Sequence, residues 1–455
     1  MSANLDTALQ AIEFAKRAGA READAWLKTE RTFSVTVRDG EVEQLLEADS
    51  LVLGLRTFLD DRVATVFSSD LSAGALRELS GQAVKLAQLS DADACVGLPD
   101  GPFADGFDAD SLELHDPTLF DHDPEELVAR AREAERAARG FDPRITNSEG
   151  ASFTRQTGAT FLANSRGFSG AYRASSCSLG VSVLADDADH KKRRDYWETT
   201  GCHFDRLEDA EEVGRKAAGR TIRRLGARKV ATQQVPVVWS PEMAREFLEW
   251  VLAAAASGEL RYRGSTFLID REGDRIASPL VTMVDDATLR GRLGSRPFDG
   301  EGLASRRTPV FERGVFNGFL FDSYSACRAG RESTANAGRA VDARLGLTVG
   351  VRPSNLTLEG GEDTPDEIIA GVERGLYLTE MLGFGENLTT GDFSRGAAGV
   401  WIDGGQLAYP VSEINIAGRL QDMLAGIDAV GDDVAVLGSV AAPTFRIAEM
   451  TVSGT

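Results

Sequence analysis

The chain of 455 residues, with 42% hydrophobic and 27% charged residues, is long enough for two domains of ordinary size and has the composition of a cored, globular protein. With 50 Lys and Arg against 71 Asp and Glu, its formal net charge is -21, which repels a phosphate backbone and an anionic membrane face. We therefore expect no direct nucleic-acid binding and no membrane attachment.

Cysteine usage and the N-terminal segment predict the cellular compartment. The chain has four widely separated cysteines and no CxxC pair: Cys95, Cys177, Cys202 and Cys327. Such spacing does not indicate a disulfide framework and is typical of a protein in a reducing cytosol. Asp6 and Glu13 interrupt the apolar pattern of residues 1–20, which predicts an amphipathic surface helix rather than a signal peptide. The longest apolar stretch, residues 250–256, is too short to span a bilayer, so we expect a cytoplasmic protein.

The N-terminal half begins with apolar residues at helical spacing, which predict a helix ending at Gly19. From residue 23 to residue 67 the apolar period changes to two, and Asp39-Gly40 predicts a hairpin turn. A long irregular connection is expected over residues 90–124, and two or three strands over residues 152–184. Further helices are predicted over residues 70–89, 124–140 and 208–225.

The residues from 226 to 229 (GARK) predict a hinge, after which the pattern is mostly strands with many glycines. Three helices interrupt these strands, over residues 241–257, 364–383 and 418–429. The fold class that follows is α+β. We expect a mixed α/β N-terminal domain over residues 1–225, followed by a β-rich C-terminal domain with a few helices over residues 226–455.

The helix predicted to begin at Ser240 has a helix-starting sequence and a wide apolar face. Ser240 is an N-cap residue, Pro241 suits the first helical position, and Glu242 complements the helix dipole. A broad apolar arc contains Met243, Phe247, Leu248, Trp250, Val251, Leu252 and Ala255. This width indicates a buried, structural helix.

Metal-binding signatures are missing from the sequence. None of the four histidines, His115, His122, His190 and His203, is followed by Glu, so the helical His-Glu pair of a zincin is absent. There is also no P-loop and no complete dinucleotide fingerprint.

Two residues are candidate nucleophiles. Ser394 lies in the phrase GDFSRG. A nucleophile elbow requires glycine two residues before the serine, and here that position is occupied by Asp392. The neighbouring Arg328 could activate the Cys327 thiol, although an inert, buried thiol is the commoner state of a cysteine.

Several long phrases follow one another in the C-terminal half: GSTFL at 264–268, SYSA at 323–326, STANAG at 333–338, GDFSRGAAG at 391–399, YPVSEINIAG at 409–418 and DML at 422–424. These phrases resemble the TldD/PmbA family, specifically its TldE (PmbA) branch. The hairpin around residues 38–41 is similar to the N-terminal domain of that family, so the resemblance covers nearly the whole chain.

The resemblance implies a metal-free chain. In this family TldD is the zinc peptidase subunit, with a helical His-Glu-x-x-x-His motif and a cysteine ligand near the C-terminus. In the register that sets Glu249 against the glutamate of the motif, Leu248 and Ala253 stand where the two histidines would be. Residues 439–443 (SVAAP) offer no cysteine. The resemblance therefore implies no catalytic residue and no cofactor in this chain, with zinc in a TldD-like partner.

For the function, the resemblance implies a non-catalytic subunit of a zinc metallopeptidase heterodimer that cleaves unfolded or small peptides, including natural-product precursors. A homodimer is the alternative assembly. Activity is expected only with the TldD-like partner. One alternative is a stand-alone hydrolase that attacks a small peptide or natural-product intermediate through Cys327 or Ser394. Another is an adaptor that contacts a basic protein surface.

A β-rich, metal-free chain could form a wall of an enclosed peptidase site and hold an extended peptide by strand addition. The glycine-rich stretch at 391–399 is a candidate for this role, because small residues let another backbone approach closely. Tight internal packing of that strand is the alternative. The candidate cleft residues are Phe393, Ser394 and Tyr324.

Overall fold

The computed structural model describes residues 3–188, 191–342 and 346–454, so His190 lies outside the described residues. Helices and several β-sheets alternate along the chain, which confirms the predicted α+β class. Among the described residues, no helix combines the length and the apolar character needed to cross a membrane.

The N-terminal half forms one antiparallel six-stranded sheet with the order β3-β2-β1-β4-β5-β6. Its strands are β1 (Glu22–Arg38), β2 (Glu41–Leu59), β3 (Arg62–Ser68), β4 (Ile145–Asn164), β5 (Ser169–Asp186) and β6 (Lys192–Gly201). The predicted hairpin turn at Asp39-Gly40 is confirmed, and both residues have positive φ (53° and 78°), as a two-residue hairpin turn requires. Strand β6 pairs only with β5 and is an edge of this sheet.

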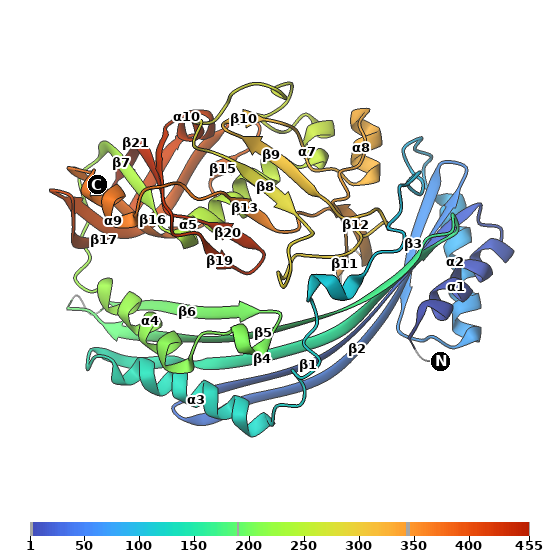
Figure 1. Cartoon of the computed structure of the whole chain (residues 1–455), viewed down its shortest axis with the longest axis horizontal. Coiled ribbons are helices and arrows are strands. Elements are labelled where there is room, and N and C mark those ends of the chain that lie inside the picture. Colours follow the sequence, from blue (N-terminus) through green and yellow to red (C-terminus); the bar gives the residue numbers. More distant parts are fainter. Residues whose placement is uncertain (1–2, 189–190, 343–345, 455) are drawn as a thin grey trace.

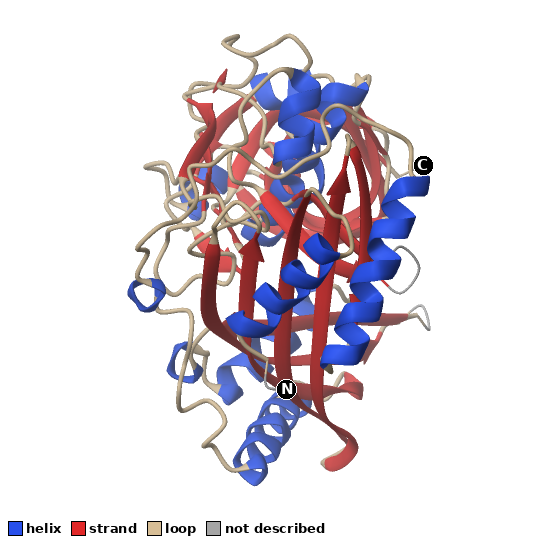
Figure 2. Cartoon of the chain, turned by 90° about the vertical axis from the view of Figure 1, so that its right-hand side faces the viewer, coloured by secondary structure: helices blue, strands red, loops and turns tan. Residues whose placement is uncertain are grey.

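Four helices cover the outer face of this sheet: α1 (Leu5–Arg17), α2 (Ala73–Leu89), α3 (Pro124–Gly140) and α4 (Ala210–Arg223). Figure 2 shows helices lying against the long strands. Because side chains alternate between the two faces of a strand, Leu27 and Val35 of β1 are buried under these helices, whereas Trp26 packs against the C-terminal half. The long connection before α3 contains one short 3-10 helix, η1 (Ala109–Leu112), and another, η2 (Phe204–Arg206), follows β6.

The C-terminal half lies on the opposite, inner face of the curved sheet (Figure 1). One of its sheets has the order β14-β7-β21-β17-β16-β15, with β18 paired to β21, and a second has the order β10-β9-β8-β13-β20-β19. The strands of the first are β7 (Gln233–Trp239), β14 (Arg374–Leu382), β15 (Glu386–Asn387), β16 (Asp392–Asp403), β17 (Gln406–Arg419), β18 (Ile427–Val430) and β21 (Phe445–Ser453). Those of the second are β8 (Met283–Asp286), β9 (Arg307–Glu312), β10 (Val315–Phe316), β13 (Leu356–Leu358), β19 (Ala435–Leu437) and β20 (Val440–Ala442). A separate hairpin consists of β11 (Ala337–Asp342) and β12 (Gly346–Val351), and α8 (Ser323–Ala329) precedes it.

Two of the helices predicted in this half are much shorter than expected. The segment 364–383 contains only α9 (Pro365–Ala370), followed by strand β14, and the segment 418–429 contains α10 (Leu420–Ala425), followed by β18. Strand β14 lies between β7 and β16 and buries Leu376 and Leu378. Pairing on both sides therefore overrides the local preference for helix.

The helix predicted at 241–257 is present but irregular. It consists of α5 (Pro241–Glu246), a π-helical turn η3 (Phe247–Leu252) and α6 (Ala253–Ala255), and a short helix α7 (Gly258–Arg263) follows. Trp250, which the sequence placed on the buried arc, is 54% exposed. A π-helical turn contains more residues than an α-helical turn, so the angular positions assumed for an α-helix do not hold after Phe247.

A buried group of four charged side chains joins the two halves. Asp24 of β1 accepts hydrogen bonds from Arg56 of β2 (2.9 Å) and from Arg339 of β11 (3.0 and 2.8 Å), and Glu301 contacts Arg56 at 3.3 Å. Burial alone would raise the pKa of Asp24, but Arg339 and Arg56 outweigh it and hold that pKa below its ordinary value. Two positive and two negative charges thus neutralise one another across the interface.

Replacing Arg339 by Met would leave a buried Asp24 with only one of its two cationic partners. We expect the free energy of unfolding to fall by about 3–5 kcal/mol, measured by urea unfolding followed through tryptophan fluorescence. The matched variant Arg307→Met breaks an ion pair with Glu359 in which both side chains are 52% exposed, and it should change stability far less. Equal losses in the two variants would contradict the role assigned to the buried network.

Candidate functional site

The edge strand β6 faces the C-terminal half (Figure 1). Residues of this strand and of the C-terminal half line a cleft. Its volume is about 320 Å³, and its walls come from β6, the end of α4, α5, β14 and the turn after β19. Strand β19 is itself the edge of the second C-terminal sheet. The cleft is therefore bordered by edge strands of two different sheets.

The open edge of β6 presents main-chain groups to this cleft. The Arg194 carbonyl accepts a hydrogen bond from the Arg224 side chain (2.7 Å), and the Tyr196 N–H donates to the carboxylate of Asp195 (2.8 Å), so neither group is used in pairing with β5. Because main-chain groups alternate in direction along a strand, Glu198 and Thr200 also direct their N–H and C=O groups toward the open edge. The side chains of both residues line the cleft.

Two arginines join the two halves at the cleft, one in α4 and one directly after its C-terminal end. Arg220 donates to Asp195 of β6 (3.1 Å) and also pairs with Glu242 of α5. Arg224, the residue after α4, donates to Glu380 of β14 (3.2 Å). These ion pairs fix the distance between the edge strand and the opposite wall.

A narrower cavity of about 80 Å³ adjoins the cleft and shares Asp195, Arg220, Arg224, Glu242 and Thr379 with it. Tyr377 of β14 lines this cavity, and burial raises its pKa to about 12. The Tyr377 hydroxyl therefore remains neutral and can serve as a hydrogen-bonding group near physiological pH.

The residues that the predicted register sets against the family's zinc ligands do not fit a zinc ion. Leu248 and Ala253 are 1% and 5% exposed and belong to the main hydrophobic core of the C-terminal half. The adjacent Phe247 packs against Trp239, with ring centroids 5.2 Å apart. Within the described ranges, no group of three His, Cys, Asp or Glu side chains is placed to hold a metal ion. Apolar side chains supply no ligand for zinc, so we derive no chemical step through a metal in this chain.

The three residues predicted to line a substrate cleft lie in other parts of the C-terminal half than the cleft beside β6. Phe393 of β16 is buried against Trp239 and Phe247, and Ser394 is exposed on the same strand. Tyr324 lies on α8, where its hydroxyl donates to Asp93 (2.8 Å). Neither the cleft beside β6 nor its narrower extension is lined by any of these three residues.

The glycine-rich strand β16 has no free edge for a peptide. It pairs with β14 and β15 on one side and with β17 on the other. At Gly399, a Cβ atom would lie 2.1 Å from the Tyr377 carbonyl oxygen, so this glycine is required for contact within the sheet. The alternative of tight internal packing is the one that the structure supports.

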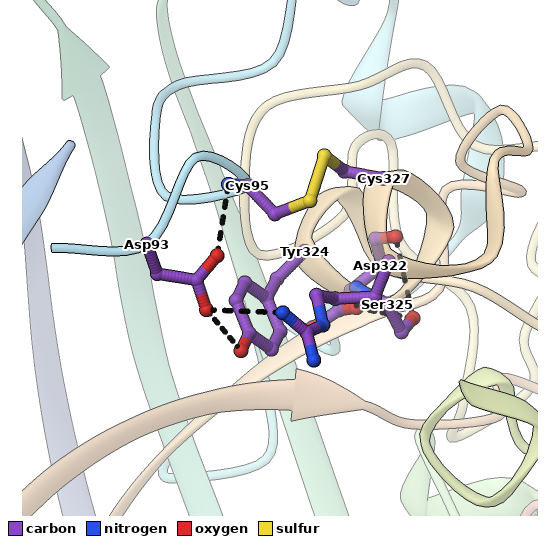
Figure 3. The surroundings of a disulfide bond; sticks show 7 residues. Asp93, Cys95, Asp322, Tyr324, Ser325 and Cys327 are labelled. Atoms are coloured by element: carbon purple, nitrogen blue, oxygen red, sulfur yellow. Dashed lines mark hydrogen bonds and ion pairs between the residues drawn. A yellow bond between two sulfur atoms is a disulfide. The ribbon is translucent and has the colours of Figure 1, made fainter. Parts of the chain in front are cut away.

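A disulfide links the two halves on the far side of the molecule from α4 (Figure 3). Cys95, in the connection after α2, is bonded to Cys327 of α8, with their Cα atoms 5.4 Å apart. Asp93 accepts hydrogen bonds from the Cys95 N–H (3.0 Å) and from Tyr324, and it pairs with Arg328. The spacing of the cysteines did not predict this bond, because only folding brings together two residues that are 232 positions apart.

This bond also removes a candidate nucleophile. The Cys327 sulfur is bonded to Cys95, so it cannot act as the activated thiol of a stand-alone hydrolase in this state. Cys177 and Cys202 are free and buried, and burial raises their pKa values to about 12 and about 11. Both thiols are therefore protonated at neutral pH.

The residues that form the cleft were not predicted from the sequence. Strand β6 was not recognised, although Tyr196, Glu198 and Thr200 alternate with Trp197 and Thr199 at the period of a strand. The hydrophobic alternation in this strand is weak because charged residues occupy both of its faces. This weak alternation was the only local signal for strand β6. It gives no information about α5 and β14, which form the opposite wall of the cleft.

Comparison with known proteins identifies the family. Family profiles described as PmbA/TldA metallopeptidase domain 1, central domain and C-terminal domain match residues 23–87, 117–225 and 232–454. The metalloprotease PmbA homolog of Haemophilus influenzae is 34% identical over 444 residues, which cover 98% of this chain and 94% of the relative. The metalloprotease PmbA of Escherichia coli O157:H7 is 34% identical over 421 residues, covering 92% and 90%.

Solved structures agree over the full length. A Bacteroides thetaiotaomicron protein has a TM-score of 0.91 and 27% identity, covering 99% of this chain and 98% of that one. TldE from Thermococcus kodakarensis has a TM-score of 0.86 at 21% identity, covering 98% and 100%, which is a likeness of fold alone. Fold and sequence together define an α+β protein of metallopeptidase type. The chain belongs to the PmbA/TldD family, in its PmbA (TldE) branch.

The cysteine chemistry predicts a pattern of alkylation. Native protein treated with iodoacetamide at about pH 8 should remain unmodified, because two cysteines are bonded and the other two are buried thiols. After mild reduction, Cys95 and Cys327 should react first, since Cys327 is exposed, and Cys177 and Cys202 should react only after unfolding. Peptide mass mapping identifies the modified sites. Alkylation of Cys327 without a reductant would show that the bond is absent.

Proposed function

We propose that this chain is the non-catalytic, PmbA/TldE-type subunit of a cytoplasmic zinc metallopeptidase, paired with a TldD-like chain. Its own contribution is to hold an extended segment of an unfolded or short peptide in the cleft beside β6. The family membership supports a role in peptide hydrolysis, and the apolar residues at Leu248 and Ala253 support a role without metal in this chain.

The observation that carries the proposal is the open edge of β6. A strand edge with free N–H and C=O groups binds an extended peptide through main-chain hydrogen bonds, independently of much of the peptide's sequence. Glu198 and Thr200, which line the cleft, offer such groups at the open edge. This binding mode selects unfolded segments and short peptides.

The catalytic step belongs, in this proposal, to the partner. When zinc is bound in such a partner, it supplies an activated water and polarises the peptide carbonyl. This chain contributes an orienting wall, because its edge strand fixes the direction of the peptide and the ion pairs of Arg220 and Arg224 fix the width of the cleft. Neither a nucleophile nor a metal ligand of this chain is needed for that role.

The main-chain role of β6 predicts different effects for two substitutions at one position. Glu198→Pro removes an N–H that faces the open edge without removing a bond to β5, so the fold should persist. We expect binding of a dye-labelled extended peptide to weaken about tenfold, because one main-chain hydrogen bond is lost and the strand edge is distorted. Glu198→Ala keeps the N–H and should bind within about twofold of the unchanged protein.

Fluorescence anisotropy measures the two affinities, and thermal melting confirms that both variants are folded. Equal binding by Glu198→Pro and Glu198→Ala would rule out strand addition at β6.

A further inference from the structure

Two carboxylates that line the cleft, Glu198 and Glu246, have no ion pair among the described residues, and Glu246 is the less exposed of the two. Glu246, the last residue of α5, is partly buried and lines the cleft. No hydrogen bond or ion pair engages its side chain among the residues that the structure describes. Burial raises the pKa of Glu246 above the ordinary value for glutamate, and the charges of Arg245 and Arg395 offset only part of this effect.

The nearby arginines are already engaged by other carboxylates. Arg245 donates to Glu249 (3.0 Å), and Arg395 donates to both oxygens of Glu386 (2.9 and 2.7 Å). The Arg224–Glu380 pair across the cleft is likewise complete. Because each of these cations is neutralised by its own partner, Glu246 leaves a net negative charge in this part of the cleft.

An exposed aromatic ring completes the surroundings of Glu246. Tyr196 of β6 is 51% exposed and lines the same cleft. Tyr196 and Glu246 line the same cleft from β6 and α5, and burial, and then the charge of Glu246, raise the pKa of Tyr196. A carboxylate beside an aromatic ring is a favourable site for an organic cation, through a charge-assisted hydrogen bond and contact with the ring face.

We propose that the cleft prefers extended peptides that carry an ammonium or guanidinium group, and that Glu246 binds this group next to Tyr196. The preference rests on the proposed function, because the peptide main chain must first pair with β6. The cation could be a lysine or arginine side chain or the free amino terminus of a short peptide, since all of them offer the same chemistry to the carboxylate.

The test compares matched peptides on the purified full-length chain. Two N-acetylated peptides of alternating threonine and valine carry either lysine or its uncharged analogue norleucine at the central position, with the dye attached through the C-terminal amide. We expect the lysine peptide to bind about tenfold more tightly than the norleucine peptide. Glu246→Gln should abolish this preference and leave the norleucine peptide unchanged, since glutamine keeps the shape of the side chain.

Two further comparisons separate local from general effects. Glu373→Gln removes the same formal charge from an exposed site outside the cleft and should keep the tenfold preference. A norleucine peptide with a free amino terminus tests whether the cation is the terminus rather than a side chain. If this peptide binds tightly, and Glu246→Gln abolishes the tight binding, Glu246 binds the amino terminus of the peptide.

Equal affinity of the unchanged protein for all three peptides would overturn the cation subsite while leaving strand addition in place. A preference that persists in Glu246→Gln would overturn the assignment to Glu246. Failure of every peptide to bind the unchanged protein would overturn both the subsite and the proposed function.

Discussion

The buried group of Asp24, Arg56, Arg339 and Glu301 is the interaction on which the arrangement of the two halves depends. Asp24 and Arg56 come from the N-terminal sheet, whereas Arg339 and Glu301 come from the C-terminal half, and the side chains are between 1% and 9% exposed. Charges so deeply buried are stable only when they meet in the correct geometry, since an unpaired member would remain desolvated without compensation. The group therefore disfavours any other placement of one half against the other.

Close packing around this group restricts the interface further. Trp26 and Leu162 of the N-terminal sheet pack with Phe298 and Leu347 of the C-terminal half. At Gly54, a Cβ atom would lie 2.1 Å from a methyl carbon of Leu347, so a larger residue there would require the Leu347 side chain to move. Because the cleft has one wall in each half, this fixed placement also sets its width and keeps the edge of β6 opposite α5 and β14. Under the proposed function, a peptide would enter a preformed site and lose less binding energy to reorganisation.

Local sequence signals predicted local structure well. The Asp39-Gly40 turn and the Ser240 N-cap depend on a few neighbouring residues, and the structure contains both as expected. Strand β14 was mistaken for a helix because its two neighbours in the sheet, β7 and β16, are distant in sequence. The Cys95–Cys327 bond was missed for the same reason, and so was the cleft, whose lining residues extend from Arg194 to Gly438. The family resemblance identified the chain correctly. Two residues in its phrases have structural contacts: the Tyr324 hydroxyl donates a hydrogen bond to Asp93, and Phe393 is buried in the core.

The central claim is that this chain holds peptide and supplies no metal. Its most direct test is the metal content and peptidase activity of the purified chain, alone and co-purified with a TldD-like partner. The account predicts a lone chain without stoichiometric zinc and without activity, and a complex with about one zinc per pair that hydrolyses unfolded peptide. Stoichiometric zinc in the lone chain, together with peptide hydrolysis that a chelator abolishes, would contradict it.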